Sequence, residues 1–302
     1  MNEHKNEKSQ EEKEEEVIDR LDSLDIVKTI GTGSFATVKL CKHVMTRQCF
    51  ALKTMSILEM IKMKQVQHVK NEKKVLQQVN HPFIIKLMWS HIDKSSIHFL
   101  FPFVNGGELF YHLRKCERFP VNRVRFYSSE IVSALAYLHS LKIVYRDLKP
   151  ENILLDSQGH IVLTDFGFAK TISDLSWTVC GTPDYLAPEV IQSRGHNKSV
   201  DWWALGILIY EMMHGYPPFY DDNNLGLYRK ILSSPYYWRL SSKDTGIVNC
   251  KATEQSLKMS YFRLQKCKGY CSETDNSRHH PEVGLHEERI PRCDGAQVLC
   301  RN

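Results

Sequence analysis

The hydrophobic pattern changes its period once along the chain, and this change limits the possible folds more than any other feature. From residue 24 to residue 104, runs rich in β-branched and aromatic residues alternate with glycine or polar turns, which predicts antiparallel strands. The runs are IVKTI, TVKLCKHV, QCFALKTM, FIIKLMWSHI and IHFLFPFV. After a break at Asn105–Gly107 the apolar residues recur at helical spacing, as in Phe126–Leu138 and in WWALGILIYEMM. Strands followed by helices predict an α+β fold, with a small β-rich lobe over residues 24–104 and a larger, mainly helical lobe over residues 105–232.

One segment of the small lobe departs from the strand pattern. In QVQHVKNEKKVLQQVNHP the valines and Leu76 keep helical spacing, and Asn80 with Pro82 marks the end of the helix. Glu72 falls on the apolar stripe, where a carboxylate needs a partner. Alternation in the strand CFALKTM directs Lys53 to one side, so Lys53 is the natural partner. On these two residues alone, a purely structural ion pair is the simpler interpretation.

Charge is distributed unevenly. Residues 1–23 hold 4 basic and 9 acidic side chains, whereas the whole chain carries a net charge of +5, so the remainder is basic. We therefore expect residues 1–23 to form an acidic, solvated tail. No Lys/Arg block is dense enough to predict binding to nucleic acid or to a membrane surface, and no apolar run reaches the length of about 18 residues that predicts a membrane span.

The N-terminal sequence also bears on location. MNEHKNEKSQEEKEEE lacks the apolar core of a signal peptide, and Asn2 stands where myristoylation requires glycine. We therefore expect a cytoplasmic protein, with the nucleus as a second candidate location. In that compartment the 9 cysteines are expected to be free thiols.

Residues 233–302 differ in character from the preceding sequence. This segment is rich in Cys, Ser and charged residues and has no sustained apolar stripe, so we expect a divergent tail that is disordered or poorly ordered. The spacing of some of its residues permits a zinc site, but no finger or ribbon pattern surrounds them, and unselected composition is the better explanation. These residues are Cys267, Cys271, His279, His280 and Cys293.

A glycine-rich run, GTGSFATV, extends from Gly31 to Val38 between two strand-like segments. Its glycines would let backbone amides approach a polyphosphate closely. A hairpin turn without any ligand is the commoner origin of such a run. The run is neither a Rossmann fingerprint nor a Walker loop, because no helix starts after it and no Gly-Lys-Ser/Thr follows. Its role therefore depends on residues elsewhere in the chain.

Two polar stretches of the large lobe carry chemistry. YRDLKPEN places Asp147, Lys149 and Asn152 on a short loop, and DFG places Asp165 on the next one. Two acids and an amide oxygen suit Mg²⁺, a hard cation that keeps phosphates in its coordination shell. Either stretch alone is consistent with loop residues that cap helices. Together with the lysine, the glutamate and the glycine run upstream, they favour a nucleotide site.

These motifs resemble those of the eukaryotic Ser/Thr protein kinases, specifically the AGC group and its cAMP-dependent type, including the X-linked and Y-linked catalytic subunits. The resemblance covers residues 24–232 and rests on GTGSFATV, FALK, YRDLKPEN, DFGFAK, CGTPDYLAPE and VDWWALG. Tyr145, where most kinases have His, agrees with this subgroup. The resemblance implies a bilobal protein kinase fold and transfer of the γ-phosphate of Mg-ATP to protein serine or threonine.

The resemblance also implies roles for the site residues. Lys53, held by Glu72, would contact the α and β phosphates of ATP. Asp147 would orient the substrate hydroxyl and accept its proton, and Lys149 would steady the transferred phosphate. In this mechanism the protein supplies mainly positioning and charge stabilisation.

Further residues would hold the nucleotide and its metal. Asp165 and Asn152 would bind Mg²⁺. The phosphates would be covered by the glycine loop, which contains Gly31, Thr32, Gly33, Ser34 and Phe35. The adenine would contact the apolar side chains of Val38 and Ala51. It would also form hydrogen bonds with the backbone of Pro102 and Val104, in the segment that leads into the large lobe.

Glu108, Glu151 and Glu211 match the acidic pocket with which this family binds arginines ahead of the target residue. Carboxylate and guanidinium groups pair with defined geometry, so the implied substrates are proteins with Arg at the second and third positions upstream. An apolar pocket for the next residue would involve Val179, Pro183 and Leu186. A cAMP-binding regulatory subunit is an implied partner.

Thr178 matches the activation phosphothreonine of the family, which implies an upstream activating kinase. The phosphate would meet cations at the matching positions His68, Arg146 and Lys170. A threonine in an exposed loop without modification is the alternative.

Two departures from the family pattern concern stability and activity. Ala36 replaces the third glycine of the loop, which would cost about 1 kcal/mol if the backbone there has positive φ. No arginine is recognisable to pair with Glu189 of the Ala-Pro-Glu motif, which predicts an unpaired buried carboxylate at a cost of about 3–5 kcal/mol. The alternative to an active enzyme is therefore a catalytically impaired kinase-like protein that binds nucleotide or regulatory partners without efficient turnover.

Overall fold

The computed structural model describes residues 21–172 and 175–233. The chain divides into two units, residues 1–250 and 251–302, and all described residues lie in the first. The expected acidic tail before residue 21, the divergent tail after residue 233 and the candidate zinc ligands lie outside the described residues.

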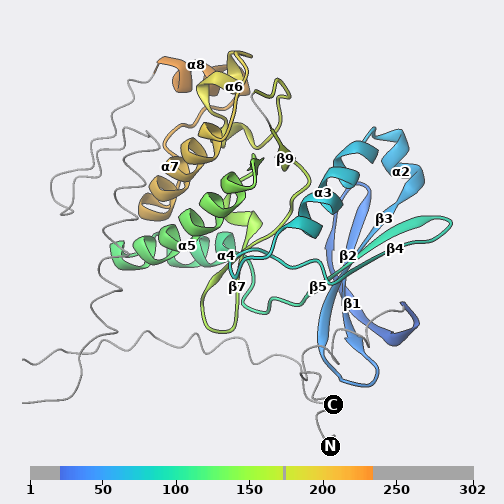
Figure 1. Cartoon of the computed structure of the whole chain (residues 1–302). Helices are drawn as coiled ribbons and strands as arrows, with labels where there is room; N and C mark the ends of the chain where they lie inside the picture. The colour runs from blue at the N-terminus through green and yellow to red at the C-terminus, as the bar shows by residue number, and fades with distance from the viewer. Residues whose placement is uncertain (1–20, 173–174, 234–302) are drawn as a thin grey trace, which may run out of the picture. The chain divides into compact units, whose positions relative to one another are not determined.

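A five-stranded antiparallel sheet forms the small lobe (Figure 1). Its order is β1-β2-β3-β5-β4, so neighbours in the sheet are mostly neighbours in the sequence. Alternating side chains of β3 and β5 feed two apolar clusters, one around Phe50 and Leu100 and the other around Met55 and Phe99. The strands are β1 Leu24–Thr32, β2 Ala36–His43, β3 Cys49–Ser56, β4 Trp89–Ile92 and β5 Ser96–Pro102, preceded by the short 3₁₀ turn η1 Leu21–Ser23.

Two helices lie between β3 and β4 in the sequence. Helix α2, Ile57–Lys62, is capped by Ser56, whose hydroxyl accepts a hydrogen bond from Glu59 N. Helix α3, Val66–Gln78, buries one stripe that includes Val69, Glu72 and Val75. The predicted helix, its end before Asn80 and the inward position of Glu72 are all confirmed.

One predicted strand is shorter than expected. Residues 83–88 of the run FIIKLMWSHI are not in a strand, and β4 begins at Trp89. Ile84 instead forms an isolated parallel bridge with Leu163 of the large lobe. Ile84 and Ile85 thus pair with the large lobe, whereas Leu87 and Met88 pack against the apolar clusters of the small sheet, a division that hydrophobicity alone does not reveal.

The break at Asn105–Gly107 connects the two lobes. Gly106 N donates to Leu155 O over 2.8 Å, and a Cβ on Gly106 would lie 2.4 Å from that oxygen. Gly107 has φ +76°. Close backbone approach at one position and left-handed backbone at the next explain the two consecutive glycines.

The large lobe is mainly helical, with two short two-stranded sheets. Figure 1 shows α4, α5 and α7 grouped together. The helices are α4 Leu109–Cys116, α5 Val121–Ser140, α6 Pro188–Ile191, α7 Ser199–His214 and α8 Asn224–Ser233, with 3₁₀ turns η2 Pro150–Asn152 and η3 Pro183–Tyr185. The strands are β6 Ile143–Val144, β7 Ile153–Leu155, β8 Ile161–Leu163 and β9 Lys170–Thr171, with β6 paired to β9 and β7 to β8.

Helices α5 and α7 carry the core of this lobe. Ile131, Leu135 and Leu138 of α5 are fully buried, whereas Phe126, expected on the same face, is 43% exposed. Phe126 lies one position off the buried stripe, where Tyr127 is buried instead. Helix α7 is buried along most of its length, as its nearly uniform apolar sequence predicts.

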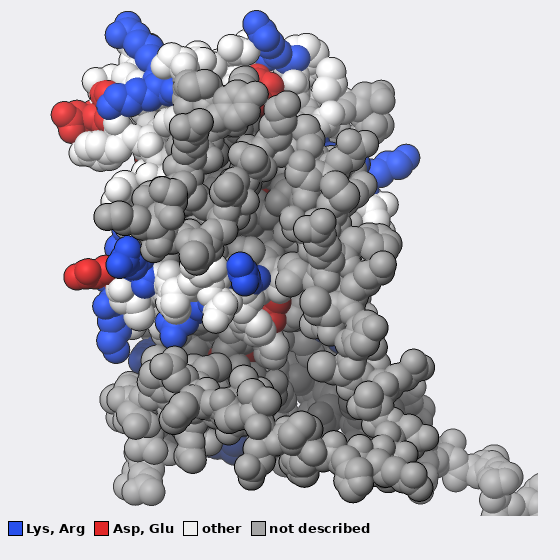
Figure 2. All heavy atoms as spheres, turned by 90° about the vertical axis from the view of Figure 1, so that its left-hand side faces the viewer, with Lys and Arg blue, Asp and Glu red and all other residues white. Residues whose placement is uncertain are grey.

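Three general expectations can be compared with the described residues. Cys41, Cys49, Cys116 and Cys180 are free thiols. No helix in the described part is long and apolar enough to cross a membrane. On the face drawn in Figure 2, Lys and Arg are more frequent than Asp and Glu among the described residues, which agrees with the basic character expected beyond the acidic tail.

Candidate active site

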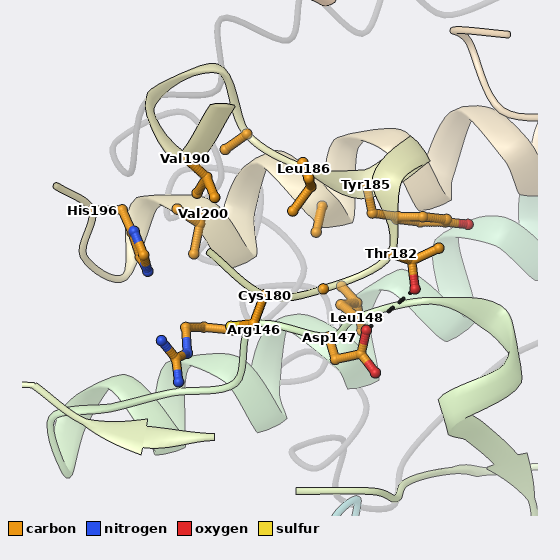
Figure 3. A pocket seen from close by; sticks show the side chains of 13 residues that line it. Arg146, Asp147, Leu148, Cys180, Thr182, Tyr185, Leu186, Val190, His196 and Val200 are labelled. Atoms are coloured by element: carbon orange, nitrogen blue, oxygen red, sulfur yellow. Dashed lines mark hydrogen bonds between the residues drawn. The ribbon is translucent and has the colours of Figure 1, made fainter. Parts of the chain in front are cut away.

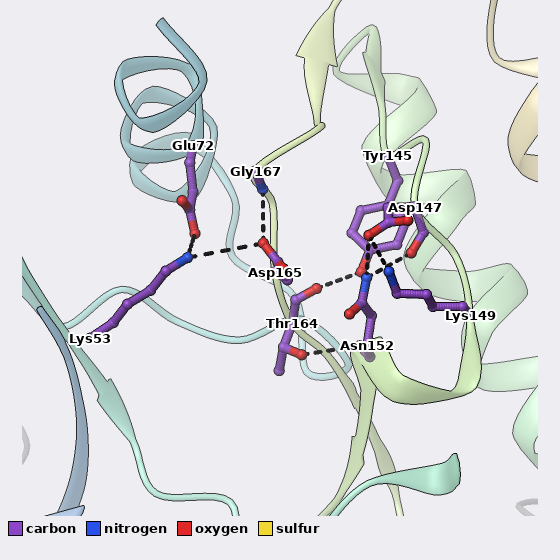
Figure 4. Close-up of polar contacts among 9 residues, drawn as sticks. All are labelled: Lys53, Glu72, Tyr145, Asp147, Lys149, Asn152, Thr164, Asp165 and Gly167. Carbon is purple, nitrogen blue, oxygen red and sulfur yellow. Dashed lines mark hydrogen bonds and ion pairs between the residues drawn. The ribbon is translucent and has the colours of Figure 1, made fainter. Parts of the chain in front are cut away.

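An ion pair joins the small sheet to α3. Lys53 on β3 donates from Nζ to Glu72 Oε1 over 2.7 Å, and Asp165 Oδ1 lies 4.0 Å from the same nitrogen (Figure 4). Glu72 is buried, while the Asp165 side chain is largely exposed. The structure thus brings together three charged groups from β3, α3 and the loop after β8.

The electrostatics of this group favour a charged lysine. Burial opposes the charge on Lys53, but the carboxylates of Glu72 and Asp165 outweigh it and hold the pKa of Lys53 above its ordinary value. Lys53 is therefore cationic at neutral pH. A fixed cation beside an exposed carboxylate is suited to hold a phosphate group together with a metal ion.

The loop between β6 and β7 brings together the second group. Lys149 Nζ donates to Asp147 Oδ2 over 2.9 Å, and Asn152 Nδ2 donates to the same oxygen over 2.7 Å (Figure 4). Thr182 Oγ1 donates to Asp147 Oδ1 over 3.3 Å. Burial raises the pKa of Asp147, and its hydrogen bonds to Lys149 and Asn152 oppose this rise. The base, the cation and the amide expected from YRDLKPEN do share one small volume.

The backbone of this site is strained at two positions. Arg146 has φ +67° and Asp165 has φ +51°, values that L-residues rarely adopt. Such strain persists only where surrounding contacts impose it, and it clusters at functional sites. Here it turns Asp165 out towards Lys53, and Gly167 N donates to Asp165 Oδ1 over 3.2 Å.

Asp201 on α7 holds the strained loop, and the sequence analysis did not identify it. Its carboxylate accepts from Tyr145 N over 2.9 Å, from Arg146 N over 2.8 Å and from His139 Nε2 over 2.7 Å. Asp201 is only 1% exposed. The sequence did contain a signal for it, because Asp201 stands at the start of the apolar run VDWWALGILIY. A carboxylate that is buried with such a run needs hydrogen-bond partners.

Tyr145 connects the two polar stretches. Its side chain is fully buried, its hydroxyl donates to Thr164 O over 2.5 Å, and its ring meets Phe166 edge-on at 5.1 Å. Thr164 and Phe166 flank Asp165. The tyrosine that replaces the usual histidine therefore bonds the loop of Asp147 to the loop of Asp165.

The glycine run forms the β1–β2 turn, and Gly33 N donates to Ala36 O over 2.7 Å. Neither Gly31 nor Gly33 has positive φ, and a Cβ at either would meet only ordinary contacts of 3.6 Å or more. Hairpin geometry therefore does not require glycine at these positions, and their expected contact with a polyphosphate stays a prediction. Thr32 and Ser34 are exposed beside them.

One expectation for this loop is revised, and the assignment of Phe35 to the nucleotide stays a prediction. Ala36 lies in β2, paired with Met55, and does not have positive φ, so the strain expected from replacing a glycine is absent. Phe35, expected over the phosphates, is half-buried and packs against the cluster that includes Met55 and Phe99. The aromatic ring therefore anchors the turn to the lobe.

The residues expected around the adenine lie on adjacent strands. Val38 on β2 pairs with Lys53, and Ala51 on β3 pairs with Phe101 of β5. Pro102 ends β5 and Val104 follows it. All four expected residues are half-buried, so each retains surface for a ligand.

The donor set is compatible with Mg²⁺. The Asp165 carboxylate and the Asn152 amide oxygen are hard oxygen ligands. Among the described residues no group of three or more His, Cys, Asp or Glu side chains is arranged to hold a metal. An ion bound here would thus take its remaining ligands from water and phosphate, as Mg²⁺ prefers.

Comparison with known proteins assigns the family. The protein kinase domain family matches residues 24–267. This chain is a member of the protein kinase family. The cAMP-dependent protein kinase catalytic subunit 3 of Drosophila melanogaster is 55% identical over 218 residues, covering 72% of this chain and 37% of that protein.

Two further relatives agree. The cAMP-dependent protein kinase catalytic subunit PRKX of Mus musculus is 60% identical over 213 residues, which are 70% of this chain and 60% of that protein. The cAMP-dependent protein kinase catalytic subunit of Dictyostelium discoideum is 51% identical over 215 residues, 71% of this chain and 33% of that protein. The chain thus spans 60% or less of each of these three relatives. The subgroup expected from the motifs is confirmed.

The three acids expected to bind substrate arginines differ in their exposure and in their hydrogen-bond partners. Glu108 and Glu151 both have exposed surface. Partial burial of the Glu108 carboxyl, together with the nearby Glu151 charge, raises the pKa of Glu108. Glu211 is buried and already has partners, because Arg114 Nη2 donates to it over 2.9 Å and Tyr185 Oη donates to its other oxygen. A substrate guanidinium at Glu211 would have to share it with Arg114. The assignment of all three to substrate stays a prediction.

Thr178 lies in a basic cavity of the kinase domain. A hollow of about 430 Å³ is lined by Thr178 together with His68, Arg146 and Lys170. Lys64 and Lys74, which the sequence analysis did not assign to it, line the same cavity. No acidic residue is among its described lining residues. The three expected cations thus come together around Thr178 even though they lie on α3, the Asp147 loop and β9.

Asp147 is one of the residues that line a second cavity (Figure 3). The cavity is lined by Cys180, Leu186 and Val200 among others. Of the three residues expected to shape an apolar pocket for the residue after the target, Leu186 also lines this cavity, and Val179 is exposed. The grouping of Val179, Pro183 and Leu186 stays a prediction.

The expected defect at Glu189 is also absent. Glu189 is only half-buried, and Ser199 Oγ donates to its Oε1 over 2.9 Å. A serine at the start of α7 therefore supplies a partner that the sequence comparison did not anticipate. The predicted cost of an unpaired buried carboxylate does not apply.

Proposed function

We propose that this chain is an ATP-dependent serine/threonine protein kinase of the cAMP-dependent type, acting on proteins with arginine upstream of the target residue. The observation that carries the proposal is the position of Lys53 between Glu72 and Asp165, beside a loop in which Asp147, Lys149 and Asn152 share hydrogen bonds. A structural ion pair alone explains the lysine and Glu72, but it gives no reason for the exposed Asp165 on strained backbone.

In the proposed reaction each side chain has one task. Lys53 binds the α and β phosphates, and Glu72 keeps its amine in place. Asp147 accepts the proton of the substrate hydroxyl as that oxygen attacks the γ-phosphorus, and Lys149 stabilises the charge on the transferred group. ADP leaves with the bridging oxygen. Bound Mg²⁺, held by Asp165 and Asn152, would neutralise phosphate charge.

The proposed partners follow from the same resemblance. They are protein substrates with upstream arginine, an upstream kinase for Thr178 and a cAMP-binding regulatory subunit. Glu108 and Glu151 support a cationic substrate, because partial burial and then the nearby Glu151 carboxylate raise the pKa of Glu108, and a cation between the two acids would relieve their repulsion. We also propose a cytoplasmic location, with the nucleus as the second candidate.

The test is transfer of radiolabelled phosphate from ATP to an Arg-Arg-x-Ser peptide. Lys53→Met is expected to lower kcat/KM by about 100-fold or more, and Asp147→Asn by about 100-fold to 10,000-fold. Lys94→Met is the matched control, because Lys94 is an exposed lysine in the β4–β5 turn. Equal background in all four proteins would reject the enzyme.

A binding measurement separates the alternative. If turnover is absent but calorimetry detects binding of Mg-ATP that Lys53→Met abolishes, the chain is the catalytically impaired, nucleotide-binding protein. If Lys53→Met binds Mg-ATP as tightly as the unsubstituted chain, the proposed nucleotide site is wrong.

A further inference from the structure

A histidine in the turn after α3 takes part in connecting the end of that helix to the large lobe. His81 lies in the turn after α3 and is half-buried. Its ring stacks on Tyr137 of α5, with 5.1 Å between centroids and 29° between planes. Asn80 N donates to Tyr137 Oη over 2.9 Å. The turn is therefore fixed to α5 by a ring stack and a backbone hydrogen bond.

Both ring nitrogens of His81 have partners. Phe83 N donates to Nδ1 over 3.2 Å, and Nε2 lies 3.3 Å from Ser133 Oγ on α5. Because Nδ1 accepts from a backbone N–H, the neutral ring carries its proton on Nε2. A second proton would have to sit on Nδ1 and would face the Phe83 N–H. The observed contacts require an uncharged ring.

The residues after His81 pair with the strand that leads to Asp165. Ile85 N donates to Leu163 O over 2.9 Å, and Leu163 N donates to Phe83 O over 2.9 Å. Leu163 ends β8, two residues before Asp165. The turn of His81 thus lies on a short chain of contacts between the helix that carries Glu72 and the strand that carries Asp165.

We propose that His81 is a positioning residue of the active site, whose uncharged ring holds the end of α3 against α5 and β8 and so keeps Glu72 and Asp165 in place on either side of Lys53. His81 itself need touch neither nucleotide nor substrate. The proposal deepens the proposed kinase function and rests on it for the catalytic measurement only.

The surroundings of His81 support a neutral ring. Tyr137, Ser133 and Phe83 contact it, and none of them is charged at neutral pH. Burial lowers the pKa of His81, and no charged group among the described residues adds to this shift. The unfolded chain takes up the proton at about pH 6.5 and the folded chain only at lower pH, so the contribution of this residue to stability falls as pH decreases through that window.

The first experiment is the pH dependence of kcat/KM for ATP between about pH 5 and pH 8. His81→Asn keeps an acceptor for Phe83 N, since an asparagine oxygen bonds the amide two residues on, but it does not titrate. We expect kcat/KM to fall on acidification by about fivefold more in the unsubstituted chain than in His81→Asn. His81→Ala, which loses the acceptor, should be about fivefold slower already at pH 8.

Two controls define the outcome. His91→Asn changes an exposed histidine on β4 and should leave the acid limb unchanged. Asp147 titrates alike in every variant and therefore cancels in the comparison. An identical acid limb in the unsubstituted chain and His81→Asn would overturn the proposal, as would full activity of His81→Ala at pH 8.

The second experiment needs no turnover. Hydrogen-exchange protection of the Phe83 and Leu163 amides should fall below about pH 6.5 in the unsubstituted chain but not in His81→Asn. Equal protection in the two proteins would contradict the proposal. If no variant shows turnover, the proposed function fails, and this measurement still decides the role of His81.

Discussion

Asp147 shows how neighbouring groups set the properties of a single residue. Its carboxylate is buried, which raises its pKa, while Lys149 and Asn152 donate to the same oxygen and lower it. The two effects are opposed, so the titration of Asp147 depends on groups within one short loop. This balance leads to a prediction on pH dependence.

Replacing Lys149 with methionine should move the acid limb of kcat/KM to higher pH. The substitution removes a hydrogen bond and a positive charge that favour the ionised carboxylate, so the pKa of Asp147 rises further. In the proposed reaction Asp147 acts as the ionised base, so activity should be lost as pH falls through its pKa. The position of the limb, rather than its height, is the measurement, with Lys94→Met as control. A limb that stays in place or moves to lower pH would show that Lys149 does not control Asp147.

Asp201 holds the backbone of the Asp147 loop through hydrogen bonds from Tyr145 N and Arg146 N. Asp201→Asn replaces one acceptor oxygen by an N–H₂ group that faces backbone N–H donors. We expect a loss of about 1–3 kcal/mol in the free energy of unfolding, because a buried donor is left unpaired. Urea unfolding measures it, and Asp22→Asn, at an exposed position, is the control. Equal stability of the two variants would mean that the Tyr145 and Arg146 amides find other partners.

At the scale of elements, α7 shows that glycine has opposite effects on stability within a helix and at its end. Gly206 lies in the helix, and a Cβ there would meet nothing within 4 Å. Gly215 follows the helix with φ +88°, and a Cβ there would lie 2.2 Å from Glu117 O. The first glycine weakens the helix, and the second ends it.

The same substitution should therefore change stability in opposite directions. Gly206→Ala is expected to raise the free energy of unfolding by about 0.5–1 kcal/mol, the helix propensity difference. Gly215→Ala should lower it by about 1 kcal/mol or more, because of the left-handed backbone and the clash with Glu117. Thermal and urea unfolding of the two variants provide the comparison. Destabilisation by both substitutions would indicate that α7 has no room at Gly206.

At the scale of the whole kinase domain, the basic cavity around Thr178 spans both lobes. His68 comes from α3 of the small lobe, whereas Arg146 and Lys170 come from the large lobe. Arg146 also donates to Phe168 O over 2.8 Å and to Ser176 Oγ over 3.3 Å. A phosphate on Thr178 would therefore add a connection between α3 and the large lobe.

Phosphorylation of Thr178 should stabilise the domain and increase turnover. Each charge-assisted hydrogen bond to the phosphate contributes about 1.5–3 kcal/mol, and the gain should shrink as salt screens the charges. The measurement is a cycle of four proteins, with and without phosphate and with His68 or His68→Ala, followed by urea unfolding. A phosphate effect that is the same with His68 and with alanine would exclude a link through α3.

The sequence by itself determined the division into a β-rich and a helical lobe, the helix that carries Glu72 and the chemical groups of the site. The change from strand to helical period, the inward Glu72 and the close set of Asp147, Lys149 and Asn152 depend on local spacing, which is visible in a single sequence. The family motifs then supplied the roles, and the comparisons confirmed the family.

Only the tertiary structure decided which partners the buried polar groups have. Asp201 accepts hydrogen bonds from the Asp147 loop, Arg114 donates to Glu211, and Ser199 donates to Glu189. The structure also decided the backbone of Ala36, which does not have positive φ. The same holds for His81, whose ring contacts Tyr137 and Ser133 of α5. Hydrogen-bond partners of this kind come from distant parts of the chain and depend on distances and angles that no local residue pattern encodes.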